Sequence, residues 1–251
     1  MGTLTRRRFH EMASAGILFQ PSGAGPRAIG VDGEIARGVT VGQRRDGPVI
    51  HTALTNKSAS PVRLKQAVVF DEKHGYGPDT PIYGEGFQML SQTGGTIGAP
   101  RAIGGYTDLK HYRLPEPAGA VTVYNLLAVS ETTPNQTRLL AYTTSRRFAG
   151  AFHIGLTRLW ATQDLEGLEV KPGETWQLED IQMTEGPNPA VLFNDLGARL
   201  SASHPRLAWP SPPEGWCSWY CFGPRVTAAQ VLDNLDFIAK NIPSLRYIQI
   251  D

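Results

Sequence analysis

The stretch GWCSWYCFGPRVTAAQVLDNLDFIAKNIPSLRYIQID, residues 215–251, decides the fold class at the end of the chain. Its first part, 215–222, is rich in aromatic residues and is bounded by proline- and glycine-containing breakers, which predicts a short buried strand. Apolar residues then recur at three- and four-residue spacing over 227–241, and Thr227 is a good N-cap, so a helix with one apolar face is predicted. Residues 245–250 predict a second apolar strand. The order strand, helix, strand is that of a right-handed parallel βαβ unit.

Two motifs in this stretch carry a family resemblance. Gly-Trp-Cys-Ser-Trp-Tyr at 215–220 and Tyr-Ile-Gln-Ile-Asp at 247–251 flank a helix that contains Asn234. Together they resemble the first two barrel strands of glycoside hydrolase family 36, the α-galactosidase or melibiase family. The resemblance implies a β-sandwich domain followed by a (β/α)8 barrel. It also matches Asp251 with the first of two sugar-binding aspartates, the second of which is absent from this sequence.

The same resemblance implies which residues contact the sugar. Trp219 and Tyr220, at the end of the first strand, line a galactose pocket, Asp251 accepts hydrogen bonds from sugar hydroxyls, and Trp216 is a fourth substrate-binding candidate. An aromatic face suits the C–H face of galactose, and an ionised carboxylate holds adjacent hydroxyls strongly. Core packing is the alternative for the two tryptophans, and a frayed chain end is the alternative for Asp251.

Catalysis by a retaining glycosidase needs two carboxylates about 5 to 5.5 Å apart, one as nucleophile and one as acid/base. The resemblance implies that both are aspartates on later barrel strands. No catalytic residue is therefore expected in this chain, and the 251-residue polypeptide is predicted to be inactive. Because such barrels take roughly 250 residues, we predict a β-sandwich domain followed by the first βαβ unit of an incomplete (β/α)8 TIM barrel.

The sequence before this tail predicts antiparallel β-structure over 29–187. Short alternating or apolar runs are separated by turn residues and show little helical periodicity, which is typical of a sandwich. These runs are 39–41, 49–54, 62–70, 121–127, 139–144, 148–154 and 168–170. Residues 188–209 predict a linker helix and a loop, and the start of the barrel domain is predicted over 210–251.

One segment of the predicted sandwich also resembles the family. Residues 83–90, Tyr-Gly-Glu-Gly-Phe-Gln-Met-Leu, are similar to a family segment whose aromatic residue can reach over the barrel mouth. Leu90 stands where a tryptophan often appears, which makes Phe87 the substitute aromatic residue.

The N-terminus predicts export. Residues 5–9, Thr-Arg-Arg-Arg-Phe, resemble a twin-arginine signal and are followed by a weakly apolar stretch and by small residues at 22–24, where a peptidase could cut. Residues 1–28 are therefore interpreted as a signal or disordered tail, and a periplasmic or extracellular protein is expected. A cytoplasmic protein with a basic tail is the alternative.

Composition excludes several classes of function. A net charge of +1 gives no electrostatic reason to bind nucleic acid, and there is no apolar run long enough to span a membrane. The two cysteines, Cys217 and Cys221, would lie about 13 Å apart in an extended strand, too far for a disulfide. No histidine is spaced to complete a zinc site with them. Both are predicted to be buried thiols, and no metal or cofactor is expected.

Three functions remain open. The first is the N-terminal portion of a retaining α-galactosidase that hydrolyses terminal α-D-galactosyl residues of oligosaccharides. The second is a galactosyl transferase resembling raffinose synthase, or an α-N-acetylgalactosaminidase. The third is a non-catalytic sandwich that binds sugar or drives assembly. The expected partner is an α-galactoside oligosaccharide, and a homo-oligomer of the full-length protein is compatible with the resemblance.

Overall fold

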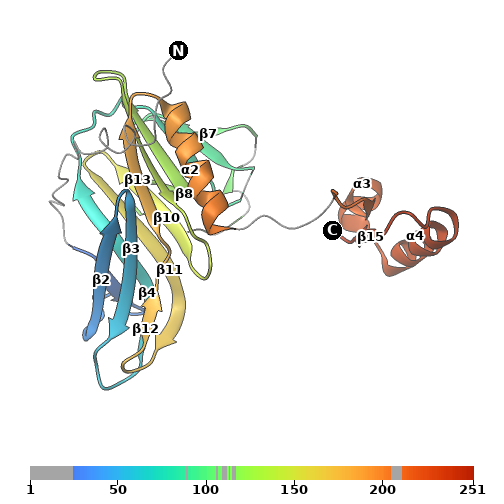
Figure 1. The fold of residues 1–251 in the computed structure, drawn as a ribbon, viewed down its shortest axis with the longest axis horizontal. Helices are drawn as coiled ribbons and strands as arrows, with labels where there is room; N and C mark the ends of the chain where they lie inside the picture. The colour runs from blue at the N-terminus through green and yellow to red at the C-terminus, as the bar shows by residue number, and fades with distance from the viewer. Residues whose placement is uncertain are drawn as a thin grey trace, which may run out of the picture. The chain divides into compact units, whose positions relative to one another are not determined.

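The computed structural model describes residues 25–88, 90–105, 107–108, 112, 114, 117–204 and 211–251. The chain forms two compact units, Met1–His204 and Pro205–Asp251 (Figure 1). The motif at residues 5–9 that predicts export lies outside the described residues.

The described part of the first unit is an antiparallel β-structure, as the alternating runs predict. Its strands follow the main order β1-β4-β11-β10-β8-β9-β13-β3-β12, while β2 pairs with β3 and a ribbon of β5, β6 and β7 pairs with β8. The strands are β1 (Arg27–Gly30), β2 (Val39–Asp46), β3 (Val49–Asn56), β4 (Val62–Lys73), β5 (Ile82–Glu85), β6 (Gln92–Gly95), β7 (Pro100–Ile103), β8 (Ala120–Glu131), β9 (Gln136–Tyr142), β10 (Ala149–Gly155), β11 (Arg158–Val170), β12 (Thr175–Gln177) and β13 (Ile181–Gly186). Each predicted run overlaps one of them.

β8 is shared between two parts of the sheet. Its first half, 120–124, pairs with β10, whereas 126–131 pairs with β9. Asn125 lies between the halves with φ 61°, in the left-handed region that asparagine tolerates better than most residues. The strand can therefore change partners without ending.

The strands enclose a large apolar core. Its fully buried members include Phe152 on β10, Leu127 on β8 and Leu140 on β9, so strands on either side of β8 contribute to one cluster. A second cluster joins β1, β3, β4, β11 and β12. Gln43 links β2 to β4 directly, since its Nε2 donates a hydrogen bond to the Val69 carbonyl at 2.8 Å. The sheet therefore curls so that strands distant in its order pack face to face.

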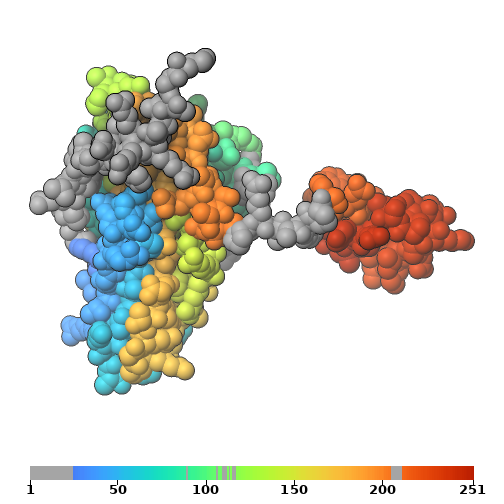
Figure 2. Space-filling model, in the orientation of Figure 1, coloured from blue at the N-terminus to red at the C-terminus, as the bar shows by residue number. Residues whose placement is uncertain are grey.

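Helix α2 (Pro189–Ser203) packs on the sheet of the first unit. Asn188 caps it, because the Asn188 side chain accepts a hydrogen bond from the Ala190 N–H at 3.0 Å. Leu192 and Leu196 are buried against residues of β8 and β9. The space-filling view shows the outer side of the helix at the surface of the first unit (Figure 2). The helix predicted as a linker thus contributes to the core of the first unit. No helix in the described ranges is long and apolar enough to cross a membrane.

The second unit contains β14 (Gly215–Cys217), α3 (Trp219–Phe222), the 3₁₀ turn η2 (Gly223–Arg225), α4 (Ala228–Asn241) and β15 (Tyr247–Gln249). The predicted helix is confirmed, and Thr227 forms a capping box with Gln230. The first strand is shorter than predicted over 215–222. Ser218 adopts helical φ and ψ angles, and the N–H groups of Cys221 and Phe222 donate to its carbonyl, so the chain turns into α3.

His153 on β10 makes the stability of the first unit depend on pH. The imidazole is 6% exposed, and its two ring nitrogens hydrogen-bond the Thr122 and Thr162 hydroxyls at 2.9 and 2.8 Å. Burial lowers the pKa of His153 from 6.5 to about 4. In the unfolded chain His153 therefore binds a proton as the pH falls through 6.5, whereas in the folded chain it does so only near pH 4. Stability is fully present above pH 6.5 and is lost as the pH falls towards 4.

We expect the free energy of unfolding to fall by roughly 2 kcal/mol between pH 7 and pH 5 because of His153. Urea unfolding across this range measures the loss. A His153→Asn variant should lose most of this slope, whereas His204→Asn, at an exposed position, should keep it. Equal slopes in the two variants would contradict the assignment to His153.

Candidate functional site

The candidate site lies at the carboxyl ends of two parallel strands in the second unit. β14 pairs with β15 in parallel, with Gly215 opposite Tyr247 and Cys217 opposite Gln249. A glycine is needed at the start of β14, because a Cβ on Gly215 would lie 2.2 Å from the Tyr247 carbonyl oxygen. The two strands therefore end at the same edge, and the residues that follow each strand share that edge.

Ser218 joins the two strand ends, and it is fully buried. Its backbone N–H donates to the Gln249 carbonyl at 3.0 Å. Its Oγ accepts from the Asp251 N–H at 3.0 Å and donates to the Asp251 carbonyl at 3.2 Å. These three bonds fix the backbone of Asp251 beside the start of α3. Sequence reasoning passed over Ser218, although a small hydroxyl residue directly after a strand was a signal for such a role.

The predicted sugar-contacting residues are brought to this edge with their side chains accessible. Trp219 and Tyr220 open α3, and they are 49% and 90% exposed. They lie in the short helix after β14 and not at the end of the strand, where they were predicted. Asp251 is exposed, and its Oδ2 accepts a hydrogen bond from Gln249 Nε2 at 3.3 Å, which leaves lone pairs on both carboxylate oxygens.

Trp216 differs from the other three candidates, because it points into the packing of its own unit. It is half-buried on β14, and its ring meets that of Phe222 with centroids 6.3 Å apart at 61°. An edge-to-face contact of this kind stabilises the turn between β14 and α3.

The two cysteines lie on either side of the turn from β14 into α3. Both are free thiols, as expected, but Cys217 is only half-buried and Cys221 is exposed. The prediction that both are buried is wrong: it rested on the general tendency of free cysteines to be buried, whereas the chain enters α3 after β14 and Cys221 lies at the surface. Within the described ranges, no group of three or more His, Cys, Asp and Glu side chains could hold a metal ion.

The segment with Phe87 lies in the first unit, in the loop between β5 and β6. Phe87 is 46% exposed, and its ring contacts Tyr112 and Tyr124 edge-on at centroid distances of 5.3 and 5.4 Å. Leu90 is 61% exposed. Phe87 thus belongs to an aromatic cluster with Tyr112 and Tyr124, in the segment where the resemblance places an aromatic residue.

Comparisons with known proteins give matches among solved structures alone: no family model and no curated protein matches the chain. The structure is similar to the GH36 α-galactosidase AgaA of Geobacillus stearothermophilus in complex with stachyose, with 12% identity and a TM-score of 0.47, over 85% of this chain and 31% of that one. It is also similar to the α-galactosidase of Lactobacillus brevis, with 10% identity and a TM-score of 0.47, over 94% and 38%.

A further match is the galactosidase domain of the α-galactosidase-sucrose kinase AgaSK, with 10% identity and a TM-score of 0.48, over 84% of this chain and 31% of that one. The chain spans about a third of the length of these enzymes. Of these three matches, AgaA is described as a GH36 α-galactosidase, and glycoside hydrolase family 36 is the family that the motifs of residues 215–251 resemble.

Proposed function

We propose that the chain is the N-terminal portion of a retaining α-galactosidase that removes terminal α-D-galactosyl groups from oligosaccharides. In this proposal the first unit is the sandwich domain, and β14, α4 and β15 are the first βαβ unit of a (β/α)8 barrel. The observation that carries it is the parallel pairing of β14 with β15, which sets Trp219, Tyr220 and Asp251 at one carboxyl edge. That edge is where barrel enzymes build their active sites.

The three residues have complementary roles in this proposal. The exposed rings of Trp219 and Tyr220 offer apolar faces to the C–H groups of a galactose. Asp251 accepts hydrogen bonds from two adjacent hydroxyls, which are strong because the acceptor is charged. Ser218 holds the backbone of Asp251, so the carboxylate is aimed before the sugar arrives. The nucleophile and the acid/base are expected on later strands, outside residues 1–251.

The test compares the 251-residue chain with a longer polypeptide that continues through a complete barrel. The longer protein should release galactose from raffinose or stachyose, and NMR should show the α-anomer of galactose first, as retention requires. The 251-residue chain should release none. Release by the short chain would contradict the placement of the catalytic carboxylates, and transfer to another sugar in place of water would favour a galactosyl transferase.

Substitution of Asp251 in the longer protein tests the binding role. Asp251→Asn should lower kcat/KM by about 100-fold, because two weakened charge-assisted hydrogen bonds correspond to about 3 kcal/mol. Asp236→Asn on the exposed side of α4 is the matched control and should leave kcat/KM unchanged. If both variants keep their activity, Asp251 does not contact the sugar.

A further inference from the structure

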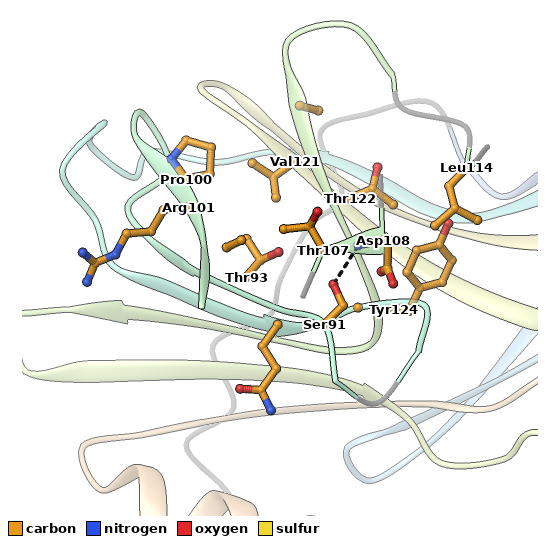
Figure 3. Close-up of a pocket in the computed structure, with 14 residues that line it drawn as sticks. Ser91, Thr93, Pro100, Arg101, Thr107, Asp108, Leu114, Val121, Thr122 and Tyr124 are labelled. Carbon is orange, nitrogen blue, oxygen red and sulfur yellow. Dashed lines mark hydrogen bonds between the residues drawn. The ribbon is translucent and has the colours of Figure 1, made fainter. Parts of the chain in front are cut away.

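A hollow lies in the first unit, where the ribbon of β5, β6 and β7 meets the start of β8 (Figure 3). Its volume is about 320 Å³, at the lower end of the range for small-molecule sites. Residues of β6, β7 and β8 line it, together with Thr107 and Asp108 from the segment that follows β7. None of these residues belongs to the 215–251 stretch on which the proposed function rests.

Asp108 is held in the wall of this hollow by the loop that precedes β6. Its carboxylate accepts the Phe87 N–H through Oδ2 and the Gln88 N–H through Oδ1, the latter at 3.4 Å, and its own N–H donates to Ser91 Oγ at 3.2 Å. Gly86 permits this approach, since a Cβ there would lie 2.5 Å from Asp108 Oδ2. One N–H on each oxygen leaves further lone pairs for a ligand.

Two threonine hydroxyls face the same hollow. Thr93 on β6 and Thr107 lie around it with Asp108 (Figure 3), and both are partly accessible. Within the described residues, neither threonine side chain makes a hydrogen bond. Each hydroxyl can therefore donate one hydrogen bond and accept others.

An aromatic wall completes the site. Tyr124 lines the hollow, and the exposed Phe87 ring packs edge-on against Tyr124 at 5.4 Å. Arg101 also belongs to the lining, but in Figure 3 its side chain extends away from Thr107 and Asp108. The hollow thus combines a carboxylate, hydroxyl groups and an aromatic ring.

We propose that this hollow binds a neutral ligand with vicinal hydroxyl groups, of the size of a monosaccharide. The carboxylate of Asp108 accepts hydrogen bonds from two adjacent ligand hydroxyls, Thr93 and Thr107 exchange hydrogen bonds with others, and Tyr124 packs against ligand C–H groups. An anionic sugar is disfavoured by the charge of Asp108. This site goes beyond the proposed function, which assigns sugar contacts to the second unit only.

Titration of the whole 251-residue chain tests the proposal, with D-galactose, myo-inositol and D-galacturonate as probes and amide NMR as the readout. We expect one or both neutral probes to bind with a Kd on the order of 1 to 10 mM and to shift the amide signals of Thr93 and Thr107. Galacturonate should bind about ten-fold more weakly than galactose.

Substitutions in the lining of the hollow test whether the neutral probe binds there. Thr107→Val replaces a hydroxyl by a methyl of the same shape, and Asp108→Asn keeps an acceptor for the Phe87 N–H, so both variants should fold. Each should weaken binding of the neutral probe by about five- to ten-fold. Thr157→Val, at an exposed turn before β11, is the matched control and should bind as the parent does.

Three results would overturn the proposal: no binding of either neutral probe up to about 100 mM, unchanged affinity in both Thr107→Val and Asp108→Asn, or tighter binding of galacturonate. Tyr220→Ala separates this site from the one in the second unit. Binding that Tyr220→Ala abolishes and Asp108→Asn leaves intact would support the proposed function and refute this inference, and the reverse pattern would support this inference independently of the proposed function.

Discussion

Replacing Arg138 by methionine should destabilise the first unit by about 3 to 5 kcal/mol. Arg138 on β9 and Glu72 on β4 form an ion pair at 2.5 Å, with side chains only 6% and 4% exposed. Methionine would leave the Glu72 carboxylate buried with no counter-charge, and the desolvation of that charge would then be uncompensated. Urea unfolding of the 251-residue chain measures the loss as a shift in midpoint at constant slope.

Two further variants distinguish the destabilisation caused by an unpaired buried charge from the stabilisation that the ion pair itself provides. The double variant Glu72→Leu/Arg138→Met should recover most of the lost stability, because apolar residues of similar size replace both charges. Lys65→Met is the matched control: it removes a pair with Asp164 at 3.1 Å whose side chains are 52% and 45% exposed, and should cost less than about 1 kcal/mol. Equal losses in Arg138→Met and Lys65→Met would refute the argument.

Truncating Phe152 to alanine should cost about 3 to 5 kcal/mol, because it opens a cavity at the centre of the main cluster. The side chain is fully buried, and its ring lies 5.0 Å from that of Tyr142 and 6.4 Å from that of Phe70, centroid to centroid. These neighbours lie on β9 and β4, so the ring packs near side chains from strands on both sides of β10 in the sheet order. Neither neighbour can fill the space without leaving its own packing.

The same unfolding measurement serves for Phe152→Ala. Phe193→Ala, at a position that is 37% exposed on α2, is the control and should change stability by less than about 1 kcal/mol. Phe152→Leu should recover part of the loss because it refills part of the cavity. A loss in Phe152→Ala no larger than in Phe193→Ala would show that the core closes around the deletion.

Helices and strands that are determined by residues within their own short segment were predictable from the sequence. The helix over 228–241 was foreseen because its cap, Thr227, lies in the same few residues as its apolar spacing. The strands of the first unit were foreseen because alternation within each run is a local property. By contrast, β6 reads Gln-Thr-Gly-Gly, which has no apolar alternation, and it forms because β5 and β7 flank it.

The geometry of the candidate site depends on distant residues, and this part could not be predicted. The turn into α3 begins at Ser218, which is held by Gln249 and Asp251 more than 30 residues further along the chain. Aromatic residues at 219–222 favour a strand locally, and the tertiary contact overrides that preference. The resemblance named Trp219, Tyr220 and Asp251 as sugar contacts, but it gave no role to Ser218, which lies in the same motif and brings their backbones together.

β8 has a consequence for how the first unit unfolds. Because one uninterrupted strand pairs with β10 in its first half and with β9 in its second half, both sides of the sheet depend on the same strand staying in place. The two sides are therefore joined into a single cooperative unit, and partial opening that leaves half of the sheet intact is disfavoured. Slow amide exchange should accordingly extend across β10, β8 and β9 with similar protection, as for one body that opens all at once.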